Sequence, residues 1–271
     1  MQLLRCFDDH EDNPITHVDG SVDAVRDMET IETELLLADI QTLTRRMERS
    51  GAGKKGDILS TGGGKALMGR VLKELNEGRP ARKMEIEEEE VGMFRELQLL
   101  TGKPMLYVCN VGESEAAEGN EHTKKVKEAV SSKGGSDSVL IVSCKLEEEV
   151  SQMSDDESAK GEMLQAYGLQ ETGLARIIKE SNGLLKLATY YTVGPQEARA
   201  WVFPEGMRAP QAAGLIHSDF ERGFIRANTM SYEDFVKYGG EAGCKDAGRM
   251  RQEGKDYVCC DGDIYHFLNN T

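Results

Sequence analysis

Several features that mark other protein classes are missing from this chain of 271 residues. Its six cysteines include no C-x-x-C pair and have no histidine at zinc-ligand spacing, so we expect neither a disulfide framework nor a metal site. No apolar run is long enough to cross a membrane, and no signal-peptide pattern appears. We therefore expect a protein of the reducing cytoplasm that has no membrane partner.

Positive charge is also scarce. The chain has 33 Lys plus Arg against 48 Asp plus Glu, which gives a net charge of −15. This balance argues against a general electrostatic hold on nucleic acid or anionic lipid, although a local basic surface could still contact RNA. With 39% hydrophobic and 30% charged residues, the composition indicates a soluble globular protein of one large domain or two smaller ones.

The sequence contains no complete phosphate-binding loop. The segment LSTGGGKAL ends in Gly64–Lys65, but the pattern G-x-x-x-x-G-K-[ST] needs glycine where Leu59 stands and a hydroxyl where Ala66 stands. The segment also joins two expected helices instead of following a strand, so we interpret it as a flexible hairpin tip. A D-x-x-G motif is absent as well, and the γ-phosphate and Mg²⁺ groups of a nucleotide hydrolase are therefore missing.

Residues 21–100 have a helical pattern. We expect Asp27 to cap a helix from about 28 to 49, a shorter helix to follow, and the acidic segment EIEEEEVGMFRELQLL to form a third helix. Apolar residues recur at helical spacing: Leu36, Ile40, Leu43 and Met47 in the first helix, and Leu67, Val71 and Leu75 in the second. Because the apolar stripes are thin and the polar faces open, residues 21–100 are predicted to form an antiparallel coiled-coil hairpin.

Residues 1–20 and 101–186 alternate between strands and helices. MQLLRCF, MLYVCN and SVLIVS are apolar runs of strand length, and the amphipathic NEHTKKVKEAVSSKG separates the last two. Such a βαβ unit predicts a parallel sheet that is covered on both faces. Because chains usually begin at a surface, a sequence that opens within a strand suggests that an upstream part is missing.

Residues 187–271 have a different pattern, with short predicted strands separated by turns and one short helix. ATYYTVGPQEARAWVF indicates a strand, a turn and a strand, PQAAGLIHSDFERGF a short helix, and IRANTMS another strand. KDYVCCDGDIYHFL indicates a final hairpin that turns at Asp261–Gly262. We expect a small mixed sheet over one helix, which is a β-grasp-like arrangement.

Polar residues follow two neighbouring strands of the predicted parallel sheet. Asn110 and Glu113 come after MLYVCN, while Ser143, Cys144 and Lys145 come after SVLIVS. In an open α/β sheet, ligands bind beyond the carboxyl ends of the strands. An asparagine and an acid three residues apart could read the edge of a nucleobase there, or could equally be turn chemistry.

These two strand ends resemble the fourth and fifth base-recognition motifs of Ras-like NTPases. The fourth motif is usually N-K-x-D, whose aspartate accepts hydrogen bonds from guanine, whereas NVGE has Val111 for lysine and Glu113 for aspartate. The longer acid cannot present the same bidentate acceptor in the same place. We therefore expect relaxed or adenine-preferring specificity, with backbone groups near Val111 binding a purine amino group at position six.

The same departure is found in the YchF or Obg-like ATPase family, which this chain resembles nearly from end to end. The longest matching runs are LLRCFDD, ITHVDGSVDAVRDMETIETELLLADI, TYYTVGPQEARAWVFPEGMRAPQAAGLIHSDFERGFIRA and AGRMRQEGKDYVCCDGDIYHFLNN. The resemblance implies a fold of class α/β plus α+β. Its parts would be a partial Ras-like G domain in residues 1–20 and 101–186, the helical insertion in 21–100, and a β-grasp TGS domain in 187–271.

The resemblance also implies a function. Family members bind and hydrolyse a purine nucleotide, favour ATP, and associate with ribosomes and RNA, so the resemblance implies ATP or GTP and a monomer. Mg²⁺ would bind through the nucleotide only if the missing N-terminal half of the G domain is present. The residues implied for the base are Asn110, Val111, Glu113, Ser143, Cys144 and Lys145. Arg199, Arg222 and Arg226 are candidate RNA contacts, because arginine suits phosphate and base contact.

Two alternatives remain at this point. In the family the P-loop and both switch motifs precede the first strand seen here, so this chain is expected to bind nucleotide weakly without hydrolysing it, and we assign no catalytic residue. A non-catalytic adaptor that binds ribosomes or RNA through the helical hairpin and the TGS domain is the alternative. The choice between ATP and GTP also stays open.

Overall fold

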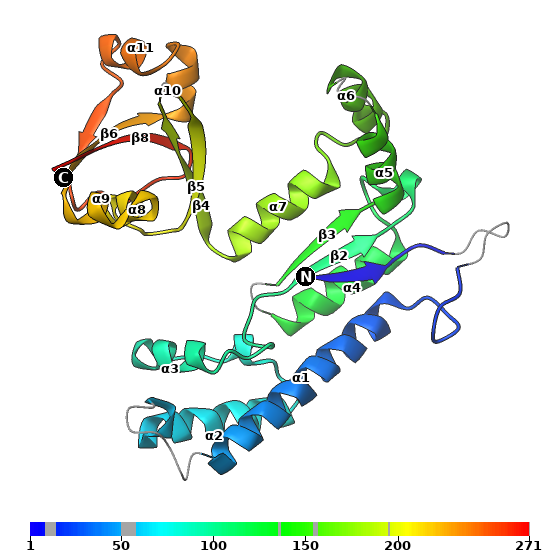
Figure 1. The fold of residues 1–271 in the computed structure, drawn as a ribbon. Coiled ribbons are helices and arrows are strands. Elements are labelled where there is room, and N and C mark those ends of the chain that lie inside the picture. Colours follow the sequence, from blue (N-terminus) through cyan, green and yellow to red (C-terminus); the bar gives the residue numbers. More distant parts are fainter. Residues whose placement is uncertain (9–14, 50–57, 135–136, 154–156, 195, 271) are drawn as a thin grey trace. The chain divides into compact units, whose positions relative to one another are not determined.

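The computed structural model describes residues 1–8, 15–49, 58–134, 137–153, 157–194 and 196–270 of the chain (Figure 1). The chain divides into two compact units, Met1–Glu180 and Ser181–Thr271. Each unit has a β-sheet and a hydrophobic core of its own. Among the helices within these ranges, none combines the length and the apolar character that a membrane crossing requires.

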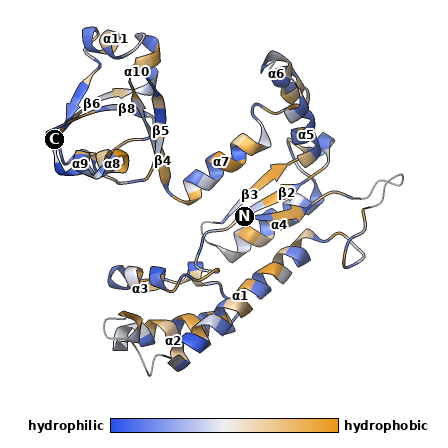
Figure 2. Cartoon of the chain, viewed as in Figure 1, coloured by the Kyte–Doolittle hydropathy of each residue, from blue (hydrophilic) through white to orange (hydrophobic). Residues whose placement is uncertain are grey.

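A three-stranded parallel sheet lies at the centre of the first unit. Its strands are β1 (Gln2–Arg5), β2 (Leu106–Asn110) and β3 (Ser138–Val142), in the order β1-β2-β3. Strand β2 is buried on both faces, as the apolar sequence of a parallel strand requires. Helix α4 (Glu121–Lys133) connects β2 to β3, so the predicted βαβ unit is confirmed. Figure 2 shows the apolar residues along these strands.

Helix α1 (Ala24–Arg49) packs its first turns on the sheet. Ala24 and Met28 are buried in one core with Leu4 and Cys109 of the sheet and Val126 of α4. Both helices therefore contribute to the core on the same face, and α1 then continues beyond the sheet into the helical part of the unit (Figure 1).

The start of α1 differs from the expectation. The carboxylate of Asp23 accepts hydrogen bonds from the backbone N–H groups of Val25 at 3.2 Å and Arg26 at 3.1 Å. Asp23 is therefore the capping residue, while Asp27 lies inside the first turn. The prediction of Asp27 as the cap was wrong. Asp23 and Asp27 are both acidic and four residues apart, and only the position at which the helical backbone begins shows which of them is the cap.

Helix α2 (Gly62–Asn76) lies beside the second half of α1 (Figure 1). The apolar stripes predicted for the two helices meet in one cluster, in which Leu43, Leu67, Val71 and Leu75 are buried and Leu36, Ile40 and Met47 are partly buried. The carboxylate of Asp39 is buried nearby and accepts hydrogen bonds from the backbone N–H groups of Leu100 at 2.9 Å and Thr101 at 2.8 Å. This contact fastens the end of the helical region to α1.

The acidic segment after α2 does not form the predicted long helix. The 3-10 helix η3 (Ala81–Lys83) precedes it, and the segment itself contains the 3-10 helix η4 (Glu88–Glu90) and the six-residue helix α3 (Val91–Glu96). The consecutive glutamates repel one another at helical spacing, and Gly92 has a low helix propensity. The expectation of a third helix through the whole segment was therefore wrong.

The glycine triplet of LSTGGGKAL begins α2 instead of forming a hairpin tip, so that interpretation was wrong. The 3-10 helix η2 (Ile58–Ser60) precedes it, and the Oγ1 of Thr61 caps α2 by accepting from the backbone N–H of Gly64 at 3.2 Å. A Cβ atom on Gly64 would lie 2.5 Å from the Cα of Leu59. Glycine is therefore required at this position by a close approach of the backbone and not by phosphate binding.

Helices α5 (Cys144–Gln152) and α6 (Glu157–Ala166) also belong to the first unit, and α7 (Gly173–Leu184) begins there and ends in the second unit. Leu146 and Val150 of α5 are buried with Leu164 of α6 in a small separate core. The carboxylate of Glu147 accepts from the backbone N–H groups of Gly173 at 2.6 Å and Leu174 at 3.1 Å. Helix α5 therefore both follows β3 and fixes the beginning of α7.

The second unit contains a five-stranded mixed sheet in the order β5-β4-β8-β6-β7. The strands are β4 (Leu187–Val193), β5 (Ala198–Pro204), β6 (Phe224–Ser231), β7 (Arg251–Glu253) and β8 (Asp263–Asn269). The helices are α8 (Ala209–Ile216), α9 (Ser218–Arg222), α10 (Tyr232–Lys237) and α11 (Glu241–Asp246). Residues of α8 share a core with Tyr190 and Phe203, and Phe235 and Cys244 belong to a second cluster with Met230 and Ile264.

The predicted antiparallel hairpin of β4 and β5 is confirmed by their pairing. The predicted final hairpin was wrong. Strand β8 lies between β4 and β6; it runs parallel to β4 and antiparallel to β6. The residue before Asp261, where we expected the turn to begin, belongs to no strand. Pairing partners in a sheet are chosen by tertiary packing, so the apolar character of a segment does not identify its neighbour.

Candidate functional site

The carboxyl ends of β1, β2 and β3 lie side by side at one edge of the parallel sheet. Arg5 stands opposite Asn110, and Asn110 stands opposite Val142. The ladder continues past the strands, because Cys6 N–H donates to the Asn110 carbonyl at 2.8 Å and Val111 N–H donates to the Val142 carbonyl at 2.9 Å. Asn110 is thus placed between two strand ends, where ligands of open α/β sheets bind.

The carboxamide of Asn110 connects β2 to the beginning of α5. Its Oδ1 accepts a hydrogen bond from the backbone N–H of Cys144 at 2.9 Å. Since only the oxygen of a carboxamide can accept, this bond fixes the orientation of the group. The Nδ2 atom then keeps two N–H donors for which the described residues provide no acceptor.

Ser143 holds the beginning of α5 in place. Its side chain is buried, and its Oγ accepts from the backbone N–H of Leu146 at 3.5 Å. Cys144 is the first residue of the helix and is exposed. Partial burial of its sulfur, followed by the nearby charge of Glu147, raises the pKa of the Cys144 thiol above its ordinary value. Ser143 therefore has a structural role, whereas Cys144 presents a protonated thiol at the surface.

Glu113 and Lys145 form a second connection between the two strand ends. Glu113 begins the 3-10 helix η5 (Glu113–Glu115), and its Oε2 accepts a hydrogen bond from the Nζ of Lys145 at 2.7 Å. The Lys145 side chain is 69% exposed, whereas that of Glu113 is 26% exposed. The hydrogen bond to Glu113, followed by its negative charge, raises the pKa of Lys145. The ammonium group therefore stays charged beside the carboxylate.

Val111 is placed differently from the other residues of the site. Its side chain is buried in the sheet core, and its N–H is bonded to Val142. Its carbonyl oxygen has no hydrogen-bond partner within the described part of the chain. Val111 can therefore offer a ligand a backbone acceptor and no side-chain contact.

Comparison with known proteins places this arrangement in a family. The family model YchF-GTPase_C, whose description is "Protein of unknown function (DUF933)", matches residues 187–270. Over 271 residues the chain is 45% identical to the ribosome-binding ATPase YchF of Bacillus subtilis, a match that covers 99% of this chain and 72% of that protein. The chain belongs to the YchF/Obg-like ATPase family.

Further relatives agree with this assignment. The chain is 37% identical over 280 residues to Obg-like ATPase 1 of Gallus gallus, covering all of this chain and 68% of that protein. Among solved structures, the YchF GTPase of Schizosaccharomyces pombe has a TM-score of 0.82 at 32% identity, covering 98% of this chain and 71% of that chain. The resemblance found from the sequence alone is thus confirmed.

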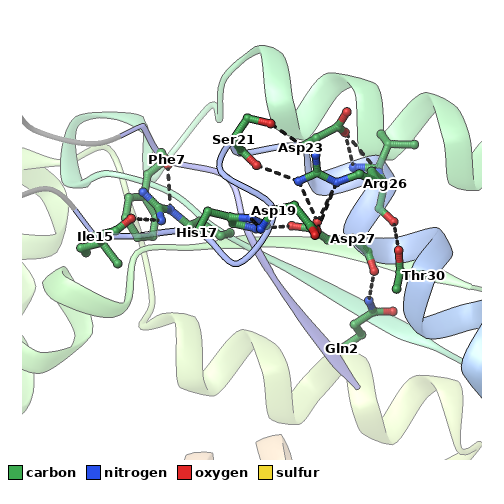
Figure 3. Close-up of polar contacts among 12 residues, drawn as sticks. Gln2, Phe7, Ile15, His17, Asp19, Ser21, Asp23, Arg26, Asp27 and Thr30 are labelled. Carbon is green, nitrogen blue, oxygen red and sulfur yellow. Dashed lines mark hydrogen bonds and ion pairs between the residues drawn. The ribbon is translucent and has the colours of Figure 1, made fainter.

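A polar cluster that we did not single out from the sequence of this YchF-family chain lies near β1 (Figure 3). The Nε2 of His17 lies 2.9 Å from Oδ2 of Asp27, and the backbone N–H of Asp19 donates to Nδ1 of His17 at 3.1 Å. The Nε of Arg26 lies 3.6 Å from Asp19. Gln2 of β1 donates from Nε2 to the Asp27 carbonyl at 3.4 Å. The cluster therefore ties the loop that follows β1 to the first turn of α1.

The composition of this cluster does not favour a metal. Candidate ligand atoms of His17, Asp19 and Asp27 lie within 4.8 Å of one another. The guanidinium of Arg26, however, already lies 3.3 Å from Oδ1 of Asp27 and neutralises the carboxylates. The sequence signal was weak, because His17 lies in a loop and Asp27 lies ten residues later in a helix, so no helix or strand period relates them.

The three arginines proposed for RNA contact belong to the second unit and do not form one patch. The guanidinium of Arg199 on β5 lies 4.2 Å from the ring centroid of Trp201. Arg222 at the end of α9 is 81% exposed and lies 3.8 Å from Asp219, and Arg226 on β6 donates to Gln252 at 3.1 Å. Two strands separate β5 from β6 in the sheet, so Arg199 and Arg226 lie roughly 14 Å apart or more.

Proposed function

We propose that this chain binds a purine nucleotide, ATP or GTP, beyond the carboxyl ends of β2 and β3. The base would lie against Asn110, Val111, Glu113, Ser143, Cys144 and Lys145. The observation that carries the proposal is the Asn110 carboxamide, whose oxygen is bonded to Cys144 and whose Nδ2 remains available. A donor held in this way can bind the N7 acceptor of a purine, and the free Val111 carbonyl can accept from an amino group.

Hydrolysis is a separate question, because it requires groups that hold the phosphates and Mg²⁺. The sequence of this chain contains no P-loop, and its Gly62–Gly64 run begins a helix. We therefore expect the 271-residue chain to hold a nucleotide weakly, through the base, and not to hydrolyse it. In a polypeptide that also carries a P-loop, the same base site would serve ATP or GTP hydrolysis, with Mg²⁺ bound to the phosphates.

We also propose that the chain associates with ribosomes as a cytoplasmic monomer. The relatives from Bacillus subtilis and Escherichia coli are named ribosome-binding ATPases. The helical insertion of residues 21–100 would be a coiled-coil hairpin, and residues 187–271 a TGS domain of the β-grasp type. Arg199, Arg222 and Arg226 would then contact RNA from separate positions of that domain.

Nucleotide binding to the purified chain tests the base site. Saturation-transfer NMR with ATP and GTP should detect binding to the wild type, and Asn110→Ala should weaken it by about tenfold, because one hydrogen bond to the ligand is lost. Asn76→Ala is the matched control, since Asn76 is exposed on α2 and donates to the Leu72 carbonyl. No binding by the wild type at millimolar nucleotide, or equal binding by Asn110→Ala, would contradict the proposal.

The adaptor alternative predicts a different result in a ribosome-pelleting experiment. A nucleotide-gated protein should change the fraction bound to ribosomes when ATP is added, and Asn110→Ala should remove that change. An adaptor should pellet equally with and without ATP in both proteins. Equal pelleting together with normal nucleotide binding would therefore favour the adaptor and would leave the base site intact.

A further inference from the structure

The carboxamide of Asn120 joins the end of β1 to the turn that carries Glu113. We propose that Asn120 is a positioning residue of the base site, which holds η5 against the end of β1 and thereby fixes where the Glu113 carboxylate lies. The inference rests on the proposed nucleotide function. It deepens that function by assigning the geometry of the site to a side chain outside both strand-end motifs.

Asn120 uses both donors and the acceptor of its carboxamide. The Nδ2 atom donates to the carbonyl of Cys6 at 2.6 Å and to Oε2 of Glu115 at 2.8 Å. The Oδ1 atom accepts from the backbone N–H of Thr123 at 3.1 Å and so caps α4. Because a carboxamide has two N–H donors, both are occupied, and the group cannot turn over without losing these bonds.

The three partners of Asn120 belong to different segments. Cys6 follows β1, is fully buried, and is fixed to β2 because its N–H donates to the Asn110 carbonyl at 2.8 Å. Glu115 ends η5, and Thr123 lies in the first turn of α4. Asn120 therefore holds three segments together at the edge of the sheet where the base is proposed to bind.

The turn of η5 passes this position on to Glu113. The backbone N–H of Glu115 donates to the Gly112 carbonyl at 3.2 Å, and that of Ala116 donates to the Glu113 carbonyl at 3.2 Å. Glu113 and Glu115 are thus the two ends of one hydrogen-bonded turn, so a shift of Glu115 also moves Glu113. Since the Nζ of Lys145 lies 2.7 Å from Oε2 of Glu113, the state of Lys145 reports on the position of η5.

Asn120→Ser separates the positioning role from the cap. Serine and asparagine are about equally good capping residues, so the serine Oγ can still accept from the N–H of Thr123. The serine side chain is shorter and has a single donor, so the bonds to Cys6 and Glu115 are lost together. Any effect on the base site then comes from the loss of the connection and not from unwinding of α4.

Three further variants serve as tests of the connection and as a control. Glu115→Ala removes the bond to Asn120 from the other side, whereas Glu115→Gln keeps an acceptor oxygen for it. Thr61→Ala is the control for a loss of stability in the first unit, because it removes the cap of α2, where the Thr61 side chain accepts from the N–H of Gly64.

The first measurement needs no nucleotide. Acetic anhydride acylates the neutral amine of a lysine, and the hydrogen bond to Glu113 keeps Lys145 protonated by raising its pKa. The Lys145 side chain is 69% exposed, so the reagent reaches it. Displacement of Glu113 in Asn120→Ser should therefore speed the acylation of Lys145 by about twofold or more. Mass spectrometry measures this rate against that of Lys160, which pairs with Glu157 on α6.

The second measurement is the dissociation constant of ATP, determined by saturation-transfer NMR on the 271-residue chain. Asn120→Ser and Glu115→Ala should each weaken ATP binding by about threefold or more, and the double variant should bind no more weakly than Asn120→Ser, because both changes break the same bond. Glu115→Gln and Thr61→Ala should bind ATP within about twofold of the wild type.

The possible failures can be told apart. If the wild type binds no nucleotide, or if Asn110→Ala binds as well as the wild type, the proposed function fails and the role of Asn120 in it fails as well. If Asn110→Ala weakens binding but Asn120→Ser leaves ATP binding or the acylation of Lys145 unchanged, the base site stands and the positioning role is overturned. Equal weakening of ATP binding by Thr61→Ala would also overturn it, because the loss would then follow stability alone.

Discussion

The guanidinium of Arg82 is bound by the carboxylate of Asp137, 55 residues away in the sequence: Nε lies 2.8 Å from Oδ1, and Nη2 lies 2.9 Å from Oδ2. The two side chains are only 6% and 4% exposed. Nη2 also donates to Glu32 of α1 at 2.9 Å and to the Tyr107 hydroxyl at 3.3 Å. This buried cluster fastens η3 and α1 to the amino end of the parallel sheet, away from Asn110.

Replacing Arg82 by methionine should destabilise the first unit by about 3–5 kcal/mol, because Asp137 would be left as an unpaired charge in a buried site. Burial opposes the charge of Arg82, but the hydrogen bond to Asp137 and its negative charge outweigh that effect and raise the pKa of the guanidinium. Arg82→Lys should recover only part of the loss, since a single ammonium group cannot reproduce the bidentate contact.

Urea unfolding checks this prediction with two signals. The chain has one tryptophan, Trp201, so fluorescence reports on the second unit, whereas most of the helical far-UV signal comes from the first. In Arg82→Met, the urea concentration at the midpoint of the far-UV transition should fall, and the midpoint of the fluorescence transition should stay unchanged. Arg79→Met is the control, because Arg79 pairs with Glu74 and Glu77 at the surface, where solvent screens the charges. Equal losses in Arg79→Met and Arg82→Met would refute the explanation.

Two neighbouring glycines of α2 should respond in opposite directions to alanine. A Cβ on Gly64 would lie 2.5 Å from the Leu59 Cα, so Gly64→Ala should destabilise the first unit by about 1–3 kcal/mol. A Cβ on Gly63 would meet only the Met93 side chain at 3.9 Å. Gly63→Ala should therefore stabilise α2 by about 0.5–1 kcal/mol. The urea midpoints of the far-UV transitions show whether each variant is less or more stable than the wild type. A stabilised Gly64→Ala would contradict the close approach of Gly64 to Leu59.

The cap of α1 should make stability depend on acid. Hydrogen bonds from the backbone N–H of Arg26, and then from that of Val25, outweigh partial burial and lower the pKa of Asp23. A lowered folded-state pKa gives stability that is present above the unfolded value of about 3.9 and is lost as pH falls through the folded value. Asp23→Asn keeps the cap but does not titrate, so the advantage of the wild type should shrink below about pH 4.

Thermal unfolding followed by far-UV signal at about pH 6 and about pH 3 measures this difference. Asp256→Asn is the control, because it removes the same charge from the second unit at a side chain that is 94% exposed. A wild-type advantage that is the same at both pH values would show that Asp23 does not act as an ionised cap.

Cys144 offers a chemical test of the base site. Its raised pKa predicts slow alkylation by iodoacetamide near neutral pH and faster alkylation as the pH rises, because the thiolate is the nucleophile. A bound purine should cover the thiol, so saturating ATP should slow the alkylation of Cys144 by about threefold or more. Cys260 is exposed in the second unit and should react equally with and without ATP. Mass spectrometry of the peptides that contain Cys144 and Cys260 measures the two alkylation rates. Equal protection of both cysteines by ATP would indicate a nonspecific effect.

Some of the site could be predicted because it depends on short-range patterns. The apolar runs MLYVCN and SVLIVS with one helix between them require parallel neighbours, so Asn110 and Ser143 had to follow strand ends at one edge. The stripes through Leu43, Leu67 and Val71 likewise required two helices to bury a common face. These features follow from periodicity, which every residue of the segment supports.

Other features could not be predicted because they join residues that have no pattern in common. The sequence shows neither that Lys145 lies against Glu113 nor that Arg82 lies between Asp137 and Glu32. The Asp23 cap, the short α3 and the central position of β8 were also mispredicted. For the cap, the ion pairs and β8, several partners of similar chemistry were available, whereas α3 is short because of its glutamates and Gly92.

The sequence by itself determined the βαβ unit, the helical stripes, the residues at the strand ends and, through its longest matching runs, the family. Tertiary structure alone decided which side chains meet: the Asn110 oxygen with Cys144, Glu113 with Lys145, and β8 with both β4 and β6. The physical reason is that burial follows local periods of two or 3.6 residues, whereas the choice of a hydrogen-bond or strand partner depends on how distant segments pack.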